Sequence, residues 1–214
     1  MPKQRVIAYI DGFNLFYSCL KGTKNKWLDL WSLCESLLLP DQELIEIHYF
    51  SALVGSFNGD NNRSNRQRIY LEALQLNPNI KVKLGYFSVH KIKAPLAEDW
   101  NLGKITSVEV IKTEEKGSDV NLAVQMAVDA LRDRFDYAML FSNDSDMAYS
   151  VQIAAKECNK KVGLYIDTKA KSFKVLRENV CYVRKLTQSY LAKHQFPHEI
   201  KTETGRIIKK PLEW

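Results

Sequence analysis

The sequence predicts an α/β fold with a mainly parallel sheet and helices on both of its faces. Residues Val6 to Ile10 form an unbroken apolar run that ends in Asp11-Gly12, and Ala138 to Phe141 form a second such run. Runs without polar alternation are typical of strands that are covered on both faces, as in parallel sheets. Strand-like and helix-like segments then alternate along the chain, which favours right-handed crossovers between neighbouring parallel strands.

The pattern of apolar residues places each element. Short apolar runs predict strands at 6–10, 44–53, 80–87, 137–142, 161–166 and 180–183, with a charged strand-like piece at 105–113. Apolar residues at helical spacing predict helices at 28–39, 62–77, 117–135, 147–158 and 173–178. Pro95 and Trp100 interrupt the pattern between 88 and 116, so a loop long enough to be functional is expected there.

Length and composition indicate one domain with an appendage. The chain has 214 residues, of which 45% are hydrophobic, enough to bury a full core. We expect the domain at 1–186 and a polar, basic C-terminal extension at 187–214, in which 203–206 would turn a small hairpin packed on the domain. No apolar stretch approaches the roughly 18–20 residues of a membrane span. The start of the chain lacks the features of a signal peptide, so a cytoplasmic protein with no membrane partner is expected.

Charge and cysteine usage narrow the chemistry. The formal net charge is +6, which is compatible with a polyanionic partner without establishing one. The cysteines lie far apart in the sequence and form no C-x-x-C pair. This spacing argues against structural zinc and against a disulfide scaffold, and it predicts buried free thiols at Cys19, Cys34, Cys158 and Cys181.

Four aspartates fall where the carboxyl ends of the parallel strands are expected to meet. Asp11 ends the first strand, Asp144 and Asp146 follow the strand at 137–142, and Asp119 lies in the first turn of a helix. Ligands of open α/β sheets bind at this edge. Taken alone, three of the acids also suit a helix cap or a first helical turn. Asp11, directly after five apolar residues, has no such explanation.

Together, the four acids predict a metal site. Carboxylates gathered at one edge repel one another unless a cation lies between them. Oxygen ligands of this kind suit Mg²⁺ or Mn²⁺, which can activate water and stabilise an in-line displacement at phosphorus. A toprim-like or other metal-dependent phosphohydrolase acting on DNA or a small phosphate ester stays open at this point, although Asp11 stands where a toprim domain has glutamate.

Three motifs carry a resemblance to a known family. Residues Asp11 to Asn14 follow a strand, Lys116 to Asp119 open a helix, and Ser142 to Asp146 follow a later strand. In this order, over residues 5–186, they resemble the NYN domains, which are PIN-like nucleases that include the LabA-like bacterial proteins. The resemblance implies a three-layer α/β/α PIN-like (Rossmann-like) fold. It also implies metal-dependent cleavage of RNA, with single-stranded RNA as the expected substrate and Mg²⁺ or Mn²⁺ as the cofactor.

The resemblance also implies roles for individual residues. The catalytic acids, which would also be the metal ligands, are Asp11, Asp119, Asp144 and Asp146. A second set would hold these acids or touch a phosphate: Asn14, Lys116, Ser142 and Ser145. Either Glu115 or Glu114 would be a further acid.

The chain departs from the family pattern at Asn143, where glycine is usual. If that position needs a positive φ, asparagine is the next most tolerant residue, so the turn should survive while the side chain narrows the approach to the metal. Met147 replaces a frequent aromatic residue, and the expected effect is on packing.

Basic residues suggest three places for an RNA strand. Arg63, Arg66 and Tyr70 share one side of an expected helix, with Arg68 nearby, so they would bind phosphates and stack a base; a solvated helix start is the alternative. The second place, in the expected loop, comprises His90, Lys91, Lys93, Trp100 and Lys104. The third, in the basic tail, comprises Lys201, Arg206, Lys209, Lys210 and Trp214.

One further alternative to a nuclease is a non-catalytic role. The same fold could serve as a nucleic-acid-binding or protein-interacting regulator of the LabA type, although a binder gains little from repelling carboxylates. The sequence leaves open whether the chain forms a homodimer or has a protein partner.

Overall fold

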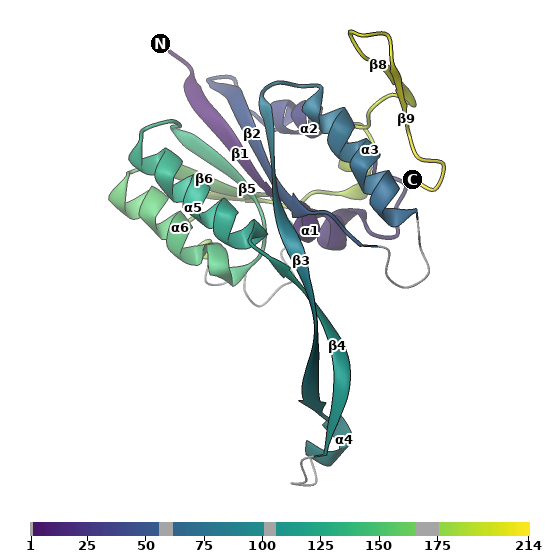
Figure 1. Cartoon of the computed structure of the whole chain (residues 1–214). Coiled ribbons are helices and arrows are strands. Elements are labelled where there is room, and N and C mark those ends of the chain that lie inside the picture. The colour runs from purple at the N-terminus through teal and green to yellow at the C-terminus, as the bar shows by residue number, and fades with distance from the viewer. Residues whose placement is uncertain (1, 56–61, 101–105, 166–175) are drawn as a thin grey trace.

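A seven-stranded sheet forms the centre of the structure, with the strand order β4-β3-β2-β1-β5-β6-β7. The computed structural model describes residues 2–55, 62–100, 106–165 and 176–214. All neighbouring strands are parallel except β3 and β4, so the mainly parallel α/β fold predicted from the sequence is confirmed (Figure 1). The strands are β1 (Gln4–Asp11), β2 (Gln42–Ala52), β3 (Ile80–Pro95), β4 (Ser107–Lys116), β5 (Tyr137–Phe141), β6 (Lys161–Tyr165) and β7 (Tyr182–Arg184).

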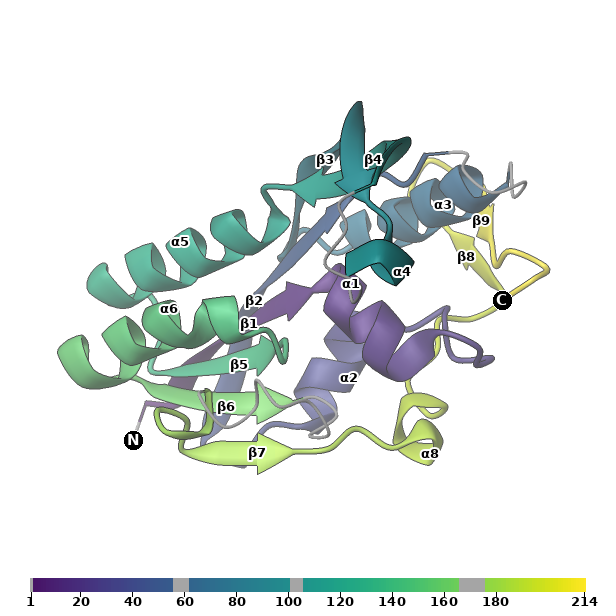
Figure 2. The ribbon, with the colours of Figure 1, turned by 90° about the horizontal axis from the view of Figure 1, so that it is seen from below.

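Helices lie on both faces of this sheet (Figure 2). One face is covered by α5 (Ser118–Leu131) and by α6 (Ala148–Gln152), which continues as the π turn η3 (Ile153–Glu157). The other face is covered by α1 (Gly12–Leu15) with the π turn η1 (Phe16–Leu20), by α2 (Leu30–Ser36) and by α3 (Arg63–Gln75). The remaining short elements are α4 (Ala97–Trp100), η2 (Ser145–Met147), α8 (Gln188–Leu191), β8 (Glu199–Lys201) and β9 (Ile207–Lys209).

Strand β1 shows how the apolar runs fit a sheet that is covered on both faces. Val6, Ala8 and Ile10 belong to a core cluster with α1, α2 and α3, whereas Ile7 and Tyr9 belong to a second cluster with α5 and α6. Alternate side chains of a strand point to opposite faces, so both sets are buried only if both faces are covered. Full burial of a valine or isoleucine side chain contributes roughly 1.5–3 kcal/mol to the free energy of unfolding.

The largest departure from the expected elements lies between residues 88 and 116. Instead of forming a long loop, β3 continues to Pro95 and pairs with β4 from Tyr86 opposite Lys116 to Pro95 opposite Ser107. Figure 1 shows the two strands leaving the sheet as a ribbon with α4 near its tip. Most side chains of this ribbon are exposed, so the apolar run that reveals a buried strand is missing.

The chain beyond β7 folds back onto the segment between η1 and α2. Leu28 and Gln195 form an isolated antiparallel bridge, and the Trp27 indole N–H donates to the carbonyl oxygen of Pro197 at 2.8 Å. Strands β8 and β9 pair as an antiparallel hairpin, from which Ile208 enters the same core cluster as α3.

Other expectations from the sequence met mixed outcomes. Cys19 and Cys34 are buried free thiols, but Cys158 is only partly buried and Cys181 is exposed because it lies next to the edge strand β7. The expected helix at 173–178, the side chain of Trp100 and all of Lys104 lie wholly or partly outside the described residues. Within the described ranges, none of the helices has the length and apolar character of a membrane span.

Candidate active site

The carboxyl ends of β1 and β5 meet at one edge of the sheet, and an open pocket lies there. Strand β1 ends at Asp11, β5 ends three residues before Asp144, and α5 begins one residue before Asp119. We call this cavity of about 890 Å³ the acidic pocket, because four carboxylates line it. The polar side chains around it include Asp11, Asn14, Glu115, Asp119, Asn143 and Asp144.

Asp11 is the most buried of these acids, with only 5% of its surface exposed. Contrary to the expectation from the sequence, it is a helix cap, the N-cap of the short helix α1. One carboxylate oxygen accepts the backbone N–H of Asn14 at 2.9 Å, and the other accepts the Ser142 hydroxyl at 3.2 Å. Burial first, and then the negative charges of Asp119 and Asp144, raise the pKa of Asp11 to about 6, although these two hydrogen bonds act to lower it. Ser142 therefore bonds to a carboxylate of the acidic pocket.

Gly12 allows the chain to turn directly from Asp11 into α1. A Cβ atom at this position would lie 2.4 Å from the Tyr49 hydroxyl and 2.8 Å from the carbonyl oxygen of Phe50. Only a residue without a side chain lets α1 approach β2 this closely. The Asp-Gly pair is thus explained by the close packing of the site.

Asn14 and Asn143 connect the two strand ends. The Asn14 amide donates to the side-chain oxygen of Asn143 at 2.8 Å, and the backbone N–H of Asn143 donates back to Asn14 at 3.4 Å. Among the described residues, positive φ angles outside glycine occur only at Asp133 and Asn159. Asn143 therefore needs no left-handed backbone, and its side chain in place of glycine bonds to Asn14 at the pocket wall.

The turn into α5 brings two further acids to the pocket. Gly117 has a φ of +97°, which favours glycine, and the next residue starts the helix. The carboxylate of Glu115 accepts the Ser118 backbone N–H at 3.1 Å and its hydroxyl at 2.8 Å. Burial raises the pKa of Asp119, and the charges of Asp144 and then Glu115 raise it further.

The acids after β5 differ from each other in position. Asp144 lines the acidic pocket and caps η2, where its carboxylate accepts the backbone N–H of Asp146 at 3.0 Å. Asp146 and Ser145 are exposed, and neither lines the pocket. Of the four aspartates predicted from the sequence, the structure therefore brings Asp11, Asp119 and Asp144 into the pocket, with Glu115 beside them. Asp146 lies outside it, although its charge also raises the pKa of Asp119.

The structure places Lys116, which the resemblance assigns to a phosphate contact, away from the acidic pocket. This side chain lies outside the acidic pocket and pairs with Glu114 at 3.1 Å, while Lys112 contacts the same carboxylate. These two lysines lower the pKa of Glu114 to about 2. Because successive residues of β4 point to opposite faces, Glu115 faces the pocket and its two neighbours face away.

The oxygen atoms that line the acidic pocket are of the type that a hard divalent cation prefers as ligands. Carboxylate and amide oxygens line the pocket, and within the described chain none of its four acids has an ion pair with a basic side chain. As they stand, no three acidic, histidine or cysteine side chains of the described residues are gathered closely enough to surround an ion. The residues that fit such an ion best are Asp11, Asp119 and Asp144, with Glu115 beside them.

Aromatic and apolar side chains form the outer walls of the acidic pocket. Phe13 of α1 packs edge-on against Phe87 of β3, with ring centres 5.8 Å apart. Ile111 and Thr113 extend this wall along the ribbon. Sequence reasoning missed these residues, because it did not predict that β3 and β4 pair into one ribbon beside the acids.

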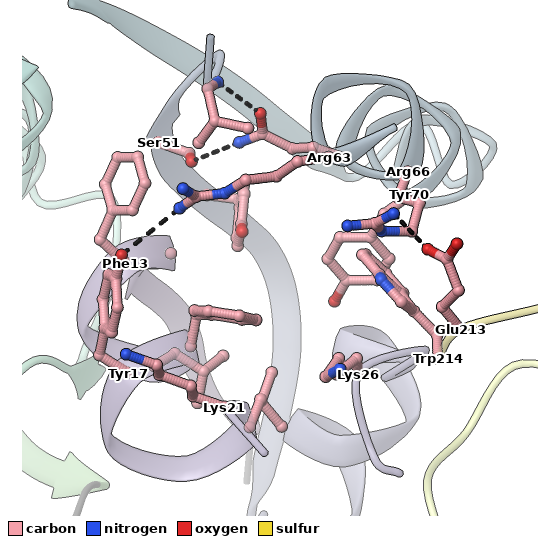
Figure 3. Close-up of a pocket in the computed structure, with 17 residues that line it drawn as sticks. Phe13, Tyr17, Lys21, Lys26, Ser51, Arg63, Arg66, Tyr70, Glu213 and Trp214 are labelled. Atoms are coloured by element: carbon pink, nitrogen blue, oxygen red, sulfur yellow. Dashed lines mark hydrogen bonds and ion pairs between the residues drawn. The ribbon is translucent and has the colours of Figure 1, made fainter. Parts of the chain in front are cut away.

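A second cavity of about 560 Å³ adjoins the first (Figure 3). We call it the aromatic pocket. It lies between α1, η1 and α3, and it shares Phe13, Tyr17, Val54 and Arg63 with the acidic pocket. Aromatic and charged side chains of its lining include Phe16, Tyr17, Lys21, Lys26, Tyr49, Arg63, Arg66, Tyr70, Glu213 and Trp214.

The predicted RNA-binding group on α3 is only partly supported by its positions. Arg63 and Arg66 line the aromatic pocket, but Arg68 is exposed and lines neither pocket. Tyr70 is buried, donates its hydroxyl to the carbonyl oxygen of Leu28 at 2.8 Å, and packs against Trp214. Tyr70 is therefore a buried part of the lining of the aromatic pocket and not a surface residue.

The other two basic places are partly used within the fold. Lys91 pairs with Glu109 across the ribbon at 3.1 Å, and Lys209 pairs with Glu199 across the hairpin at 2.8 Å. Arg206 pairs with Glu72 of α3 at 2.7 Å. Trp214 packs against Trp27 and Tyr70. The end of the C-terminal extension is therefore packed on the domain and does not form a free basic surface.

Comparisons with known proteins agree with this fold. The family model of the NYN domain matches residues 5–187. The chain is 28% identical to 6-hydroxy-3-succinoylpyridine 3-monooxygenase HspA of Pseudomonas putida, over 98% of this chain and 75% of that protein. Its structure is similar to the crystal structure of a protein of unknown function from Vibrio parahaemolyticus, with a TM-score of 0.53 and 16% identity over 87% of this chain and 95% of that one.

The family match confirms the resemblance that the three motifs predict. It spans β1 to the segment after β7, so it includes all four acids of the acidic pocket. The structural similarity to the Vibrio protein supports the fold alone. By the extent of the family match, the chain belongs to the NYN domain family, whose members are generally of the nuclease type.

Proposed function

We propose that the protein is a metal-dependent ribonuclease with a PIN-like three-layer fold that hydrolyses single-stranded RNA at the acidic pocket. The observation that carries this proposal is the buried carboxylate of Asp11, which faces Asp119 and Asp144 without a basic partner among the described residues. Carboxylates in this arrangement repel one another, so a divalent cation is the ligand that best offsets their charge.

The side chains of the pocket have separable tasks. Asp11, Asp119 and Asp144 would hold Mg²⁺ or Mn²⁺, with Glu115 as a further oxygen donor. When bound, such an ion lowers the pKa of a water molecule and offsets charge on the phosphate. Asn14 and Ser142 orient Asp11 through their hydrogen bonds, and Asn143 fixes Asn14 in turn. These contacts preorganise the acids before substrate binds.

Arg63 is the basic residue best placed for the RNA backbone. It lines both pockets, and within the described chain its guanidinium makes only a long hydrogen bond of 3.4 Å to the Tyr17 hydroxyl. A guanidinium in this position is available for bidentate contact with a phosphate. The backbone contact gives no base specificity by itself.

The test is cleavage of 5′-labelled single-stranded RNAs in Mn²⁺, Mg²⁺ or EDTA. We expect cleavage by the wild type only with a metal, and a loss of more than about 100-fold in Asp144→Asn, beyond the roughly 10–100-fold cost of losing an outer-shell partner. The matched control is Glu43→Gln, which changes an exposed acid on β2 outside both pockets. Equal cleavage by Asp144→Asn and the control would contradict the proposal.

A second candidate function is an enzymatic reaction with a small aromatic acid as the substrate. The relative from Pseudomonas putida is named for a reaction of a pyridine ring that carries a succinoyl group. The aromatic pocket, with apolar walls and basic side chains, has a size typical of small-molecule sites. If the wild type leaves RNA intact with every metal, this candidate and a non-catalytic regulatory role both gain over the nuclease.

A further inference from the structure

The aromatic pocket is formed by segments that are distant in the sequence. Residues 12–26 form one side, α3 forms the opposite side, and β2 contributes Tyr49 and Ser51 to the floor. Figure 3 shows Arg63 reaching toward Tyr17 on one side, while Arg66 contacts Glu213 beside Trp214 on the other. The cavity is therefore a defined space beside the acidic pocket.

Flat rings dominate the walls of this pocket. The rings of Phe16 and Tyr17 pack edge-on against each other, with their centres 5.3 Å apart. On the other side of the pocket, the ring centres of Tyr70 and Trp214 are 5.6 Å apart. Tyr17 is 53% exposed, so a ring that enters the pocket can contact it without rearranging the core. Aromatic walls of this kind favour a planar aromatic ligand, because stacking adds to the burial of apolar surface.

The basic side chains at the rim are mostly not neutralised within the described chain. Lys21, Lys26 and Arg63 have no acidic partner among the described residues, whereas Arg66 pairs with Glu213. The ammonium group of Lys21 lies 4.9 Å from the centre of the Tyr17 ring. Three cations beside an apolar cavity call for an anionic group at its mouth.

We infer that the aromatic pocket is a binding site for an aromatic ring that carries an anionic group. The ring lies between the side chains of Phe16, Tyr17 and Trp214, and the anion lies at Lys21 and Arg63. Because Arg63 also lines the acidic pocket, an anion there is adjacent to the carboxylates. Under the proposed function, on which this last step rests, the ligand is a nucleotide of the RNA next to the scissile phosphate.

The experiment measures equilibrium binding by calorimetry in EDTA, so that it does not depend on cleavage. The probes are uridine 5′-monophosphate, uridine, ribose 5-phosphate and benzoate. We expect the monophosphate to bind at least about 10-fold more tightly than uridine or ribose 5-phosphate, since each of these lacks one half of the required chemistry. Benzoate distinguishes a free aromatic acid from a nucleotide as the source of the ring.

Two pairs of variants locate the site. Arg63→Ala and Lys21→Ala should each weaken binding of the monophosphate by about 5-fold or more. Their matched controls are Arg68→Ala on the same helix and Lys24→Ala in the same loop, neither of which lines a pocket. Circular dichroism melting of all four variants separates loss of binding from loss of folding.

The outcomes separate this inference from the proposed function. Binding of the monophosphate that requires Arg63, without any metal-dependent cleavage, supports the site and counts against the nuclease. Cleavage with no binding of any probe overturns the site alone. If benzoate is the only probe that binds tightly, the result supports the site and assigns it to a free aromatic acid. Equal binding of uridine and its monophosphate, or equal effects of Arg63→Ala and Arg68→Ala, overturns the inference.

Discussion

Two groups of acidic side chains lie at opposite ends of the parallel strands, and only one of them is paired with basic residues. At the amino ends, Arg5 binds Asp136 at 2.9 Å and Asp133 at 3.2 Å, and Lys160 also contacts Asp133. We call these four residues the amino-end cluster. The hydrogen bonds from Arg5 lower the pKa of Asp136 to about 2. These acids stabilise the fold as anions.

The acidic pocket at the carboxyl ends has the opposite electrostatics. Burial and the neighbouring acids raise the pKa of Asp11 to about 6, and the pKa of Asp119 is also raised. Holding these groups as anions costs folding free energy at neutral pH. Residues of the same type thus contribute to stability at one end of the sheet, whereas at the other end they lie together without a basic partner among the described residues.

The largest expected difference between the two groups is in activity. Asp11→Asn should lower metal-dependent RNA cleavage by more than about 100-fold, the range associated with loss of a directly acting group. Asp136→Asn should leave the rate within about 2–3-fold, because it lies at the far end of β1. Single-turnover rates on one labelled RNA give both values, and a similar loss in the two variants would remove the functional distinction.

Metal binding should stabilise the protein through the acids of the acidic pocket and not through those of the amino-end cluster. At a Mn²⁺ concentration 100 times the dissociation constant, the free energy of unfolding should rise by about 2.7 kcal/mol. Urea denaturation with Mn²⁺ and with EDTA measures this change. The gain should disappear in Asp11→Asn and persist in Asp136→Asn; a gain that survives in both variants would place the ion elsewhere.

The pH dependence of stability in EDTA should have opposite signs for the two groups. A pKa raised to about 6 means that folded Asp11 keeps its proton more tightly than the unfolded chain does. Its contribution to the free energy of unfolding therefore falls, by about 2 kcal/mol, as the pH rises from about 4 to 6. The pKa of Asp136 is lowered, so its contribution is lost as the pH falls from about 4 to 2.

Variants can separate the contributions of Asp11 and Asp136 to the pH dependence of stability. The side chain of Asp136 is 38% exposed, so solvent screening limits its contribution to about 1 kcal/mol or less. Asp11→Asn should flatten the profile between pH 4 and 6, and Asp136→Asn should flatten it below pH 4. Denaturation midpoints across this range give the profiles, and an unchanged slope in Asp11→Asn would contradict the assignment.

The smallest expected effect concerns Asp146. Because this side chain is exposed and does not line the acidic pocket, Asp146→Asn should reduce cleavage only about 2–5-fold, less than about 1 kcal/mol of activation free energy. Glu115→Gln, which changes an acid that lines the pocket, should cost more. The reverse order would show that Asp146 and not Glu115 acts with the other acids.

The sequence was sufficient to predict the sheet and the position of the acids. Unbroken apolar runs are required only of strands buried on both faces, so β1 and β5 could be recognised, and with them Asp11 and Asp144 at their ends. The ribbon of β3 and β4 could not be recognised in the same way. Its side chains are mostly exposed, and exposed strands place few demands on hydrophobicity.

The errors in the site arise from long-range packing. Tyr70 has the spacing of a surface residue on α3, but Trp27 and Trp214 cover it from both ends of the chain. Glu114, Glu115 and Lys116 are adjacent, so only the pairing of β4 with β3 decides which of them faces the pocket. Such contacts depend on the tertiary structure and leave no local pattern in the sequence.

The packing of Trp27 against Phe196 and Trp214 has a consequence for how the chain folds. During synthesis, Trp27 leaves the ribosome long before its covering residues are made, so its indole stays exposed through most of translation. Loop closure over this sequence separation is slow relative to local helix formation. The last step in completing the core is therefore expected to be docking of the C-terminal segment, and a Trp27 fluorescence phase should follow formation of the central sheet.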